Sequence, residues 1–217
     1  MLRYTNRMGD TYYVHARRDA SGRTRYTARR DAEGAIESLP EGYEISESVN
    51  GQVSVRKQRP RKITADEERA VQHALTERGL DRYRVEVKGS AIIIHEPNHD
   101  DASLDALAER YTNYTFDLPG GIGSQVEGML RQELGDEVFE RIIAEGKERA
   151  RSLLASTNRY EAVLKLKLTE RQRRRFGISR MCFRGEGGWL GLDEGELAEL
   201  LPRYVPHLGR ESFFQLI

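Results

Sequence analysis

Alternation of polar and apolar residues is the main pattern in the first sixty positions. Residues 11–29 alternate on either side of the loop 19–22, Asp-Ala-Ser-Gly, and residues 43–56 alternate on either side of Asn50-Gly51. A period of two is typical of β-strands. Asn-Gly predicts a tight hairpin whose two central residues have positive φ, and loop 19–22 predicts a type I turn that ends in a left-handed glycine. We therefore expect two β-hairpins in series, an antiparallel meander.

The alternation also divides the first hairpin into two faces. On the return strand one face is a ladder of arginines, and Tyr26 lies on the other face. Arginine suits contact with phosphate, and aromatic rings suit stacking with bases. The candidate residues for binding nucleic acid or a protein partner are Arg17, Arg23, Arg25, Tyr26 and Arg29. An ordinary solvated face of an antiparallel sheet explains the same pattern.

The basic run Gln58-Arg59-Pro60-Arg61-Lys62 ends the meander, because proline cannot continue a β-ladder. Thr64 and Glu67 then predict a capping box at the start of a helix that runs to Gly79. The other predicted elements are a hairpin over 83–95 turning at Gly89-Ser90, a helix over 101–111, a loop over 117–123, a long helical stretch over 124–154, strands over 160–168 and 176–184, a helix over 193–201 and an apolar helical tail over 211–217.

The long helical stretch has the most pronounced apolar period after the meander. Ser124 and Glu127 predict a capping box at its start, and Gly135-Asp136 predicts an interruption. We expect it to be the central helix of the core. The chain is therefore predicted to be an α+β protein, with an antiparallel β-meander over 1–60 and, over 61–217, a helix-rich α+β body whose further hairpins form a second sheet.

Composition restricts the location of the protein. The chain has 217 residues and contains no run close to the roughly 18 apolar residues that a membrane helix needs. Its first residues lack the apolar segment of a signal peptide. The single cysteine, Cys182, excludes an intrachain disulfide and a cysteine-based metal site. We expect a soluble cytoplasmic protein that does not enter membranes.

Charge is balanced over the chain but not along it. Residues 1–62 hold 13 Lys/Arg against 8 Asp/Glu, residues 63–156 hold 11 against 19, and residues 157–217 hold 11 against 8. The basic and acidic segments either pack on one another or present a basic surface to a polyanion. Arginine makes up 29 of the 35 basic residues, a bias that a GC-rich genome also produces.

The segment His95-Glu96-Pro97-Asn98-His99 matches the zinc-protease pattern H-E-x-x-H. That pattern requires a helix, which places both histidines on one face. Here the first histidine ends a predicted strand, and Pro97 disfavours helix at the preceding residue. We therefore expect a polar loop in which Asp100 or Asp101 caps the next helix, with no metal site.

Glu86-Val87-Lys88 on a predicted strand resembles the E-x-K motif of restriction-type nucleases. In that family a carboxylate holds a metal ion and the lysine steadies the attacking water. The alternative to a binding protein is thus a metal-dependent hydrolase that uses Glu86, Lys88, His95, His99 and nearby carboxylates. A solvent-facing ladder of charges on the strand is the simpler explanation.

The glycine-rich segment 120–124 lacks the lysine of a phosphate-binding P-loop, and no parallel strand precedes it. We treat it as a connection and expect no cofactor. The five histidines are too scattered in sequence to assign a catalytic set, so the catalytic residues are unknown. Self-association into a homo-oligomer is compatible with the sequence.

Two resemblances to known proteins bear on source and binding. Segments 9–16, 40–45, 50–57 and 204–214 resemble a group of bacterial proteins with no assigned activity, which implies a bacterial source and no mechanism. Tyr12-Tyr13-Val14 with the glycine turn into basic residues resembles the three-stranded arm-binding module of tyrosine recombinases. That module ends in a helix, whereas 40–45 here starts another strand. The leading hypothesis is a non-enzymatic binding or accessory module.

Overall fold

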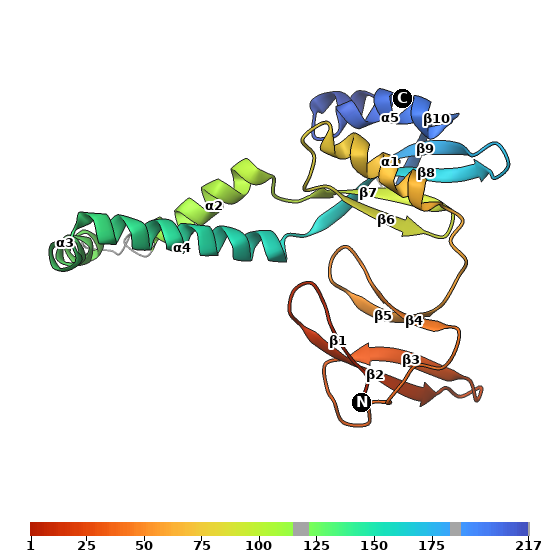
Figure 1. Ribbon diagram of the computed structural model, residues 1–217, viewed down its shortest axis with the longest axis horizontal. Helices are drawn as coiled ribbons and strands as arrows, with labels where there is room; N and C mark the ends of the chain where they lie inside the picture. Colours follow the sequence, from red (N-terminus) through yellow and green to blue (C-terminus); the bar gives the residue numbers. More distant parts are fainter. Residues whose placement is uncertain (115–121, 183–187, 217) are drawn as a thin grey trace. The chain divides into compact units, whose positions relative to one another are not determined.

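The computed structural model describes residues 1–114, 122–182 and 188–216, and it is an α+β protein with antiparallel sheets (Figure 1). The chain divides into two compact units. We call residues 1–97 with 160–217 the sheet unit, and residues 98–159 the helical unit. The boundary expected at Pro60 falls inside the sheet unit and stays a prediction.

The N-terminal part of the sheet unit forms the two predicted hairpins. Strands β1 (Arg3–Thr5), β2 (Thr11–Arg18) and β3 (Thr24–Arg29) make a three-stranded antiparallel sheet in the order β1-β2-β3. Strands β4 (Tyr43–Glu47) and β5 (Val53–Lys57) pair with each other in a second sheet. The short strand β1 was not predicted, because three residues are too few to show a period.

The two hairpins turn in the same way. The Gly22 amide donates to the Asp19 carbonyl at 3.0 Å, and the Gly51 amide donates to the Ser48 carbonyl at 2.9 Å. Both glycines have positive φ, +75° and +73°. The left-handed glycine predicted for the first loop is confirmed. The positive φ predicted for Asn50 is wrong, since within the described ranges Arg174 is the only non-glycine residue with one.

A five-stranded antiparallel sheet forms the rest of the sheet unit, in the order β10-β9-β8-β7-β6. Its strands are β6 (Arg84–Lys88), β7 (Ala91–Pro97), β8 (Tyr160–Glu170), β9 (Arg175–Cys182) and β10 (Gly188–Gly195). The predicted hairpin at Gly89-Ser90 is confirmed. Strand β10 was missed because three glycines, at 188, 191 and 195, weaken its alternation. The helix predicted from 193 begins only at Leu197.

Two helices cover one face of the five-stranded sheet (Figure 1). In α1 (Ala65–Thr76) the predicted capping box between Thr64 and Glu67 is confirmed, and Val71 and Leu75 are buried. In α5 (Leu197–Tyr204) four side chains are buried. The core between these layers includes Ile92, Ile94, Leu164, Leu166, Phe176, Ile178 and Leu200. Two short 3-10 helices, η2 (Val205–His207) and η3 (Glu211–Gln215), complete the C-terminal part.

The helical unit contains α2 (Asp101–Tyr114), α3 (Ile122–Leu134) and α4 (Asp136–Thr157). The predicted interruption is confirmed at Gly135, whose φ is +80°. The predicted capping box at Ser124 is wrong, because Ser124 lies inside α3. Of the predicted loop 117–123, residues 117–121 lie outside the described residues.

The prediction that this stretch is the central helix of the core is also wrong. In α4 only Phe139 is buried, whereas Ile142 is 49% and Leu153 is 65% exposed. The main core forms in the sheet unit instead. The spacing of apolar residues predicted the helix correctly, but this spacing does not determine which other elements the helix packs against. No helix in the described part of the chain is both long and apolar enough to span a membrane.

Candidate nucleic-acid interface

The predicted arginine ladder lies on one face of the first hairpin. Arg17 pairs with Arg25 across β2 and β3, and Tyr13 pairs with Arg29, so these four residues share that face. Arg23 immediately precedes β3. All four arginines are exposed, and the Arg25 Nε lies 3.1 Å from an Asp19 carboxylate oxygen. The four arginines are thus accessible to a ligand.

Tyr26 does not lie with the arginines. It pairs with Ala16 on the opposite face, and its ring packs edge-to-face against Tyr43 with centroids 4.8 Å apart. His15 pairs with Thr27 on the face of the arginines, but it is buried, and its Nε2 lies 3.0 Å from the Asp31 carbonyl oxygen. Tyr26 and His15 therefore serve packing within the sheet unit.

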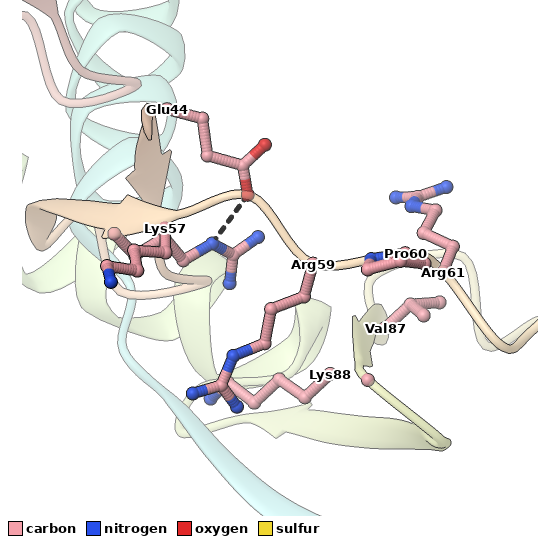
Figure 2. Close-up of a pocket in the computed structure, with 9 residues that line it drawn as sticks. Glu44, Lys57, Arg59, Pro60, Arg61, Val87 and Lys88 are labelled. Carbon is pink, nitrogen blue, oxygen red and sulfur yellow. Dashed lines mark hydrogen bonds and ion pairs between the residues drawn. The ribbon is translucent and has the colours of Figure 1, made fainter. Parts of the chain in front are cut away.

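A second basic feature was not predicted: a pocket of about 710 Å³ where the meander joins the five-stranded sheet. We call it the cationic pocket. Five basic side chains line it, those of Arg56, Lys57, Arg59, Arg61 and Lys88. The other lining residues are Glu44, which supplies the one carboxylate, and Pro60, Val87 and Gly89. Figure 2 shows the Arg59 and Lys88 side chains extending in the same direction.

The charges in the cationic pocket are only partly compensated. Arg56 bonds to Glu44 at 2.8 Å, Arg61 to Glu68 at 3.1 Å and Lys88 to Glu86 at 2.9 Å. Among the described residues, Lys57 and Arg59 have no hydrogen-bonding or ion-pair partner. The pocket therefore carries excess positive charge, which a bound anion would compensate.

Local structure explains how these cations gather. Strand β5 ends at Lys57, and Pro60 then prevents further pairing. Gly89, with φ of +61°, leads the tight turn that places Lys88 at the end of β6. The Lys62 amide donates to the Gly89 carbonyl at 3.3 Å, which holds the linker against this turn. The signal in the sequence was the run 56–62, in which five of seven residues are basic.

The sheet face next to Lys88 is also basic. Register places Lys88, Ala91 and Lys167 in one row across β6, β7 and β8, on the face opposite Leu164 and Leu166. Lys165 lies on the same face, and its Nζ is 4.2 Å from the centroid of the Trp189 ring. Burial lowers the pKa of Lys165, and the nearby charge of Lys167 lowers it further. We call Lys88, Lys165, Lys167 and Trp189 the basic sheet face.

The residues of the alternative hydrolase site are partly brought together. The His95 Nε2 lies 3.1 Å from a Glu86 oxygen that also contacts Lys88, and a β-bulge at 94/95 accompanies this arrangement. The hydrogen bond from His95 lowers the pKa of Glu86 more than burial raises it, with help from Lys88. The carboxylate is thus already occupied by two donors.

The remaining predicted ligands do not complete a metal site. His95 lies in β7, which continues to Pro97 instead of ending at His95 as predicted, so the helical geometry of H-E-x-x-H is absent. His99 belongs to the helical unit, and the Asp100 carboxylate accepts from the Ser103 amide at 2.8 Å, the predicted helix cap. No group of three His, Cys, Asp or Glu side chains within the described ranges is arranged to hold a metal ion.

Comparison of the chain with protein-family models, with curated proteins and with solved structures finds no match. Its function therefore has to be inferred from the charges and geometry described above. These features favour the cationic pocket and the basic sheet face, where uncompensated cations and an aromatic ring occur in one unit of the chain.

Proposed function

We propose that this protein binds the phosphate backbone of nucleic acid at the cationic pocket. The observation that supports the proposal is the pocket lining, in which five basic side chains face a single carboxylate and two of them have no partner in the described part of the chain. Neutralising phosphates releases counterions from the nucleic acid, so clustered cations give substantial affinity without reading sequence.

The size and surroundings of the pocket favour a single-stranded ligand. A volume of about 710 Å³ is in the range of pockets that hold small ligands, so one nucleotide fits. On the basic sheet face, which runs from Lys88 on β6 to Trp189 on β10 at the other edge of the sheet, Lys165 and Trp189 supply a cation and an aromatic ring. Basic grooves with rings on which bases stack are typical of proteins that bind single strands without sequence preference.

The exposed arginines of the first hairpin provide further phosphate contacts in the same unit. We assign phosphate contacts to the four exposed arginines, Arg17, Arg23, Arg25 and Arg29. Tyr26 is not included, because its ring packs against Tyr43. The hydrolase alternative has weaker support. Its candidate carboxylate, Glu86, is hydrogen-bonded to His95 and Lys88, and lacks a second carboxylate beside it in the described residues.

Binding is tested by fluorescence anisotropy with a labelled single-stranded DNA and the matching RNA. Lys57→Gln/Arg59→Gln is expected to lower affinity about tenfold or more, since it removes two phosphate contacts. Arg78→Gln is the control, because Arg78 is exposed on the same unit but outside the pocket. Equal effects of both variants would overturn the assignment to the pocket.

A labelled polyglutamate separates nucleic acid from an acidic protein partner. If polyglutamate binds as tightly as the DNA, the pocket recognises carboxylates and the proposed ligand is wrong. Cleavage of the DNA on addition of Mg²⁺, lost in Glu86→Gln, would instead favour the hydrolase. The proposal expects the DNA to stay intact and polyglutamate to bind more weakly.

A further inference from the structure

The helical unit exposes more apolar surface than its small core explains. Three of its apolar side chains are buried among the described residues: Leu104, Ala108 and Phe139. Six large hydrophobic side chains are exposed: Tyr111 (73%), Val126 (39%), Met129 (61%), Leu134 (42%), Ile142 (49%) and Leu153 (65%). A core this small gives little stability by itself, so the unit gains by covering part of this surface.

The exposed apolar residues of α4 lie along one line of the helix. Positions 142, 146, 149 and 153 follow the spacing i, i+4, i+7, i+11, which returns to the same side of an α-helix. Ile142 and Leu153 are the apolar ends of this stripe, and Gly146 leaves open space beside the backbone between them. Phe139, the one buried residue of α4, lies one turn before Ile142 at the start of this stripe. A second helix can therefore approach closely along it.

Two charged residues, Arg149 on the stripe and Glu145 next to it, indicate that the second helix is α4 of another copy. Glu145 and Arg149 are 58% and 83% exposed, and their side chains are 3.7 Å apart. The pair 145 and 149 and the pair 142 and 153 have nearly the same midpoint, at residues 147 and 148. A two-fold axis at this midpoint brings Ile142 to Leu153 of a second copy, and Glu145 to its Arg149. Parallel pairing would instead place like charges together.

We propose that two copies of this chain associate through α4, antiparallel and centred on residues 147 and 148. This interface is self-complementary, since one surface supplies both halves of every contact. It uses the acidic unit of the protein: residues 98–159 hold 12 Asp/Glu against 7 Lys/Arg, whereas the rest of the chain has the opposite excess. The proposal does not depend on the proposed function.

The oligomeric state tests the interface. The full chain is expected to be a dimer by light scattering and sedimentation velocity. Leu153→Glu is expected to weaken dimerisation at least about tenfold, because it places a charge against Ile142 of the second copy. Ala144→Glu is the control, since Ala144 is exposed on the side of α4 opposite the stripe. Circular dichroism checks that both variants keep their helices. A monomeric full chain would overturn the proposal.

Cross-linking tests the orientation separately. Ile142→Cys and Leu153→Cys are made as separate chains with Cys182→Ser, mixed and oxidised. Antiparallel pairing predicts disulfide-linked dimers in the mixture and few in either variant alone. Cross-linking within each variant alone would indicate parallel helices, and no cross-linking in a dimeric mixture would place the contact elsewhere. Either result would overturn the proposed interface.

Discussion

Glu44 is the one carboxylate that lines the cationic pocket, and it is bonded to Arg56 at 2.8 Å. Glu44→Gln would free Arg56 and raise the charge of the pocket by one. We expect this variant to bind single-stranded DNA a few-fold more tightly at low salt, since each added phosphate contact contributes to affinity. Glu41→Gln is the matched control, because Glu41 is exposed outside the pocket lining. Weaker binding by Glu44→Gln would contradict the role given to the pocket.

Glu67 connects three parts of the sheet unit. Its side chain closes the capping box with Thr64, and the Arg174 Nε donates to it at 2.7 Å from the turn between β8 and β9. Arg174 holds a φ of +51°, unusual for a residue other than glycine. Burial alone would raise the pKa of Glu67, but the hydrogen bonds from Arg174 and the Thr64 amide lower it overall.

A lowered pKa in the folded state links Glu67 to stability at acid pH. Its contribution is complete above the pKa of glutamate in the unfolded chain, about 4.3, and is lost as pH falls through the lower folded value. Glu67→Gln is expected to reduce the free energy of unfolding by about 2 kcal/mol at neutral pH. Urea unfolding at several pH values should show this difference shrinking below about pH 4.3.

The adjacent Glu68 provides the control for that measurement. It bonds to Arg61 at 3.1 Å on the surface, so Glu68→Gln should change the free energy of unfolding by less than about 1 kcal/mol. If the two variants lose the same stability, or if the loss at Glu67 does not depend on pH, the partly buried ion pair between Glu67 and Arg174 is not the cause.

The turn of the second hairpin, unlike that of the first, is hydrogen-bonded to a distant strand. The Asn50 side chain donates to the Tyr160 carbonyl at 2.9 Å and accepts from the Tyr160 amide at 2.7 Å, as a neighbouring strand would. This pair of bonds attaches the hairpin β4-β5 to the start of β8. These bonds give a physical reason why Asn50 does not have the positive φ expected from the Asn-Gly turn.

Removal of these two bonds should loosen the hairpin. Asn50→Ala is expected to lower the free energy of unfolding by about 1–2 kcal/mol, because the two Tyr160 backbone groups lose their partners. Ser21→Ala, at the equivalent position of the first turn, should have a smaller effect, since Ser21 is exposed and bonds within its own loop. Hydrogen exchange at the Tyr160 amide is the more specific measurement. Unchanged protection in Asn50→Ala would show that another contact attaches the hairpin.

Strand β10 contributes the aromatic ring of the basic sheet face. Trp189→Ala is expected to weaken binding of single-stranded DNA by about 1–3 kcal/mol, the usual loss when a stacked ring is removed. Binding of duplex DNA should change less, because paired bases do not stack on side chains. Anisotropy with both probes measures the difference. A loss of the same size on both probes would mean that Trp189 supports the strand and does not contact bases.

The elements that sequence predicted are those whose signals are local. The left-handed glycine at 22, the capping box at Thr64 and the break at Gly135 each depend on a few neighbouring residues. The errors arose where distant contacts decide. The α4 helix was correctly identified and placed in the wrong layer, and β10 was missed because it depends on pairing with β9.

The candidate site shows the same limit. The arginine ladder was predicted from a period of two within one hairpin, and the strand register confirms that Arg17, Arg25 and Arg29 lie on one face. The cationic pocket required Lys88 to lie near residues 56–61, which no local pattern specifies. The basic run at 56–62 is visible in the sequence, but by itself it predicts only the end of the meander.

Charge divides the molecule into two units of opposite sign. The sheet unit holds five more Lys/Arg than Asp/Glu, and the helical unit holds five more acidic than basic residues. A net charge of zero therefore does not exclude a polyanionic ligand. Nucleic acid is expected to contact the sheet unit alone, while the helical unit is left to associate with a second copy.

The salt dependence of DNA affinity tests the central claim most directly. If the cationic pocket binds phosphates, the logarithm of the affinity falls linearly with the logarithm of salt concentration, with a slope of about −0.7 per phosphate contact on a single strand. Lys57→Gln/Arg59→Gln should make this slope shallower by about two contacts, whereas Arg78→Gln should leave it unchanged. Negligible affinity at low salt, or the same slope in the pocket variant and in the unmodified protein, would contradict the account.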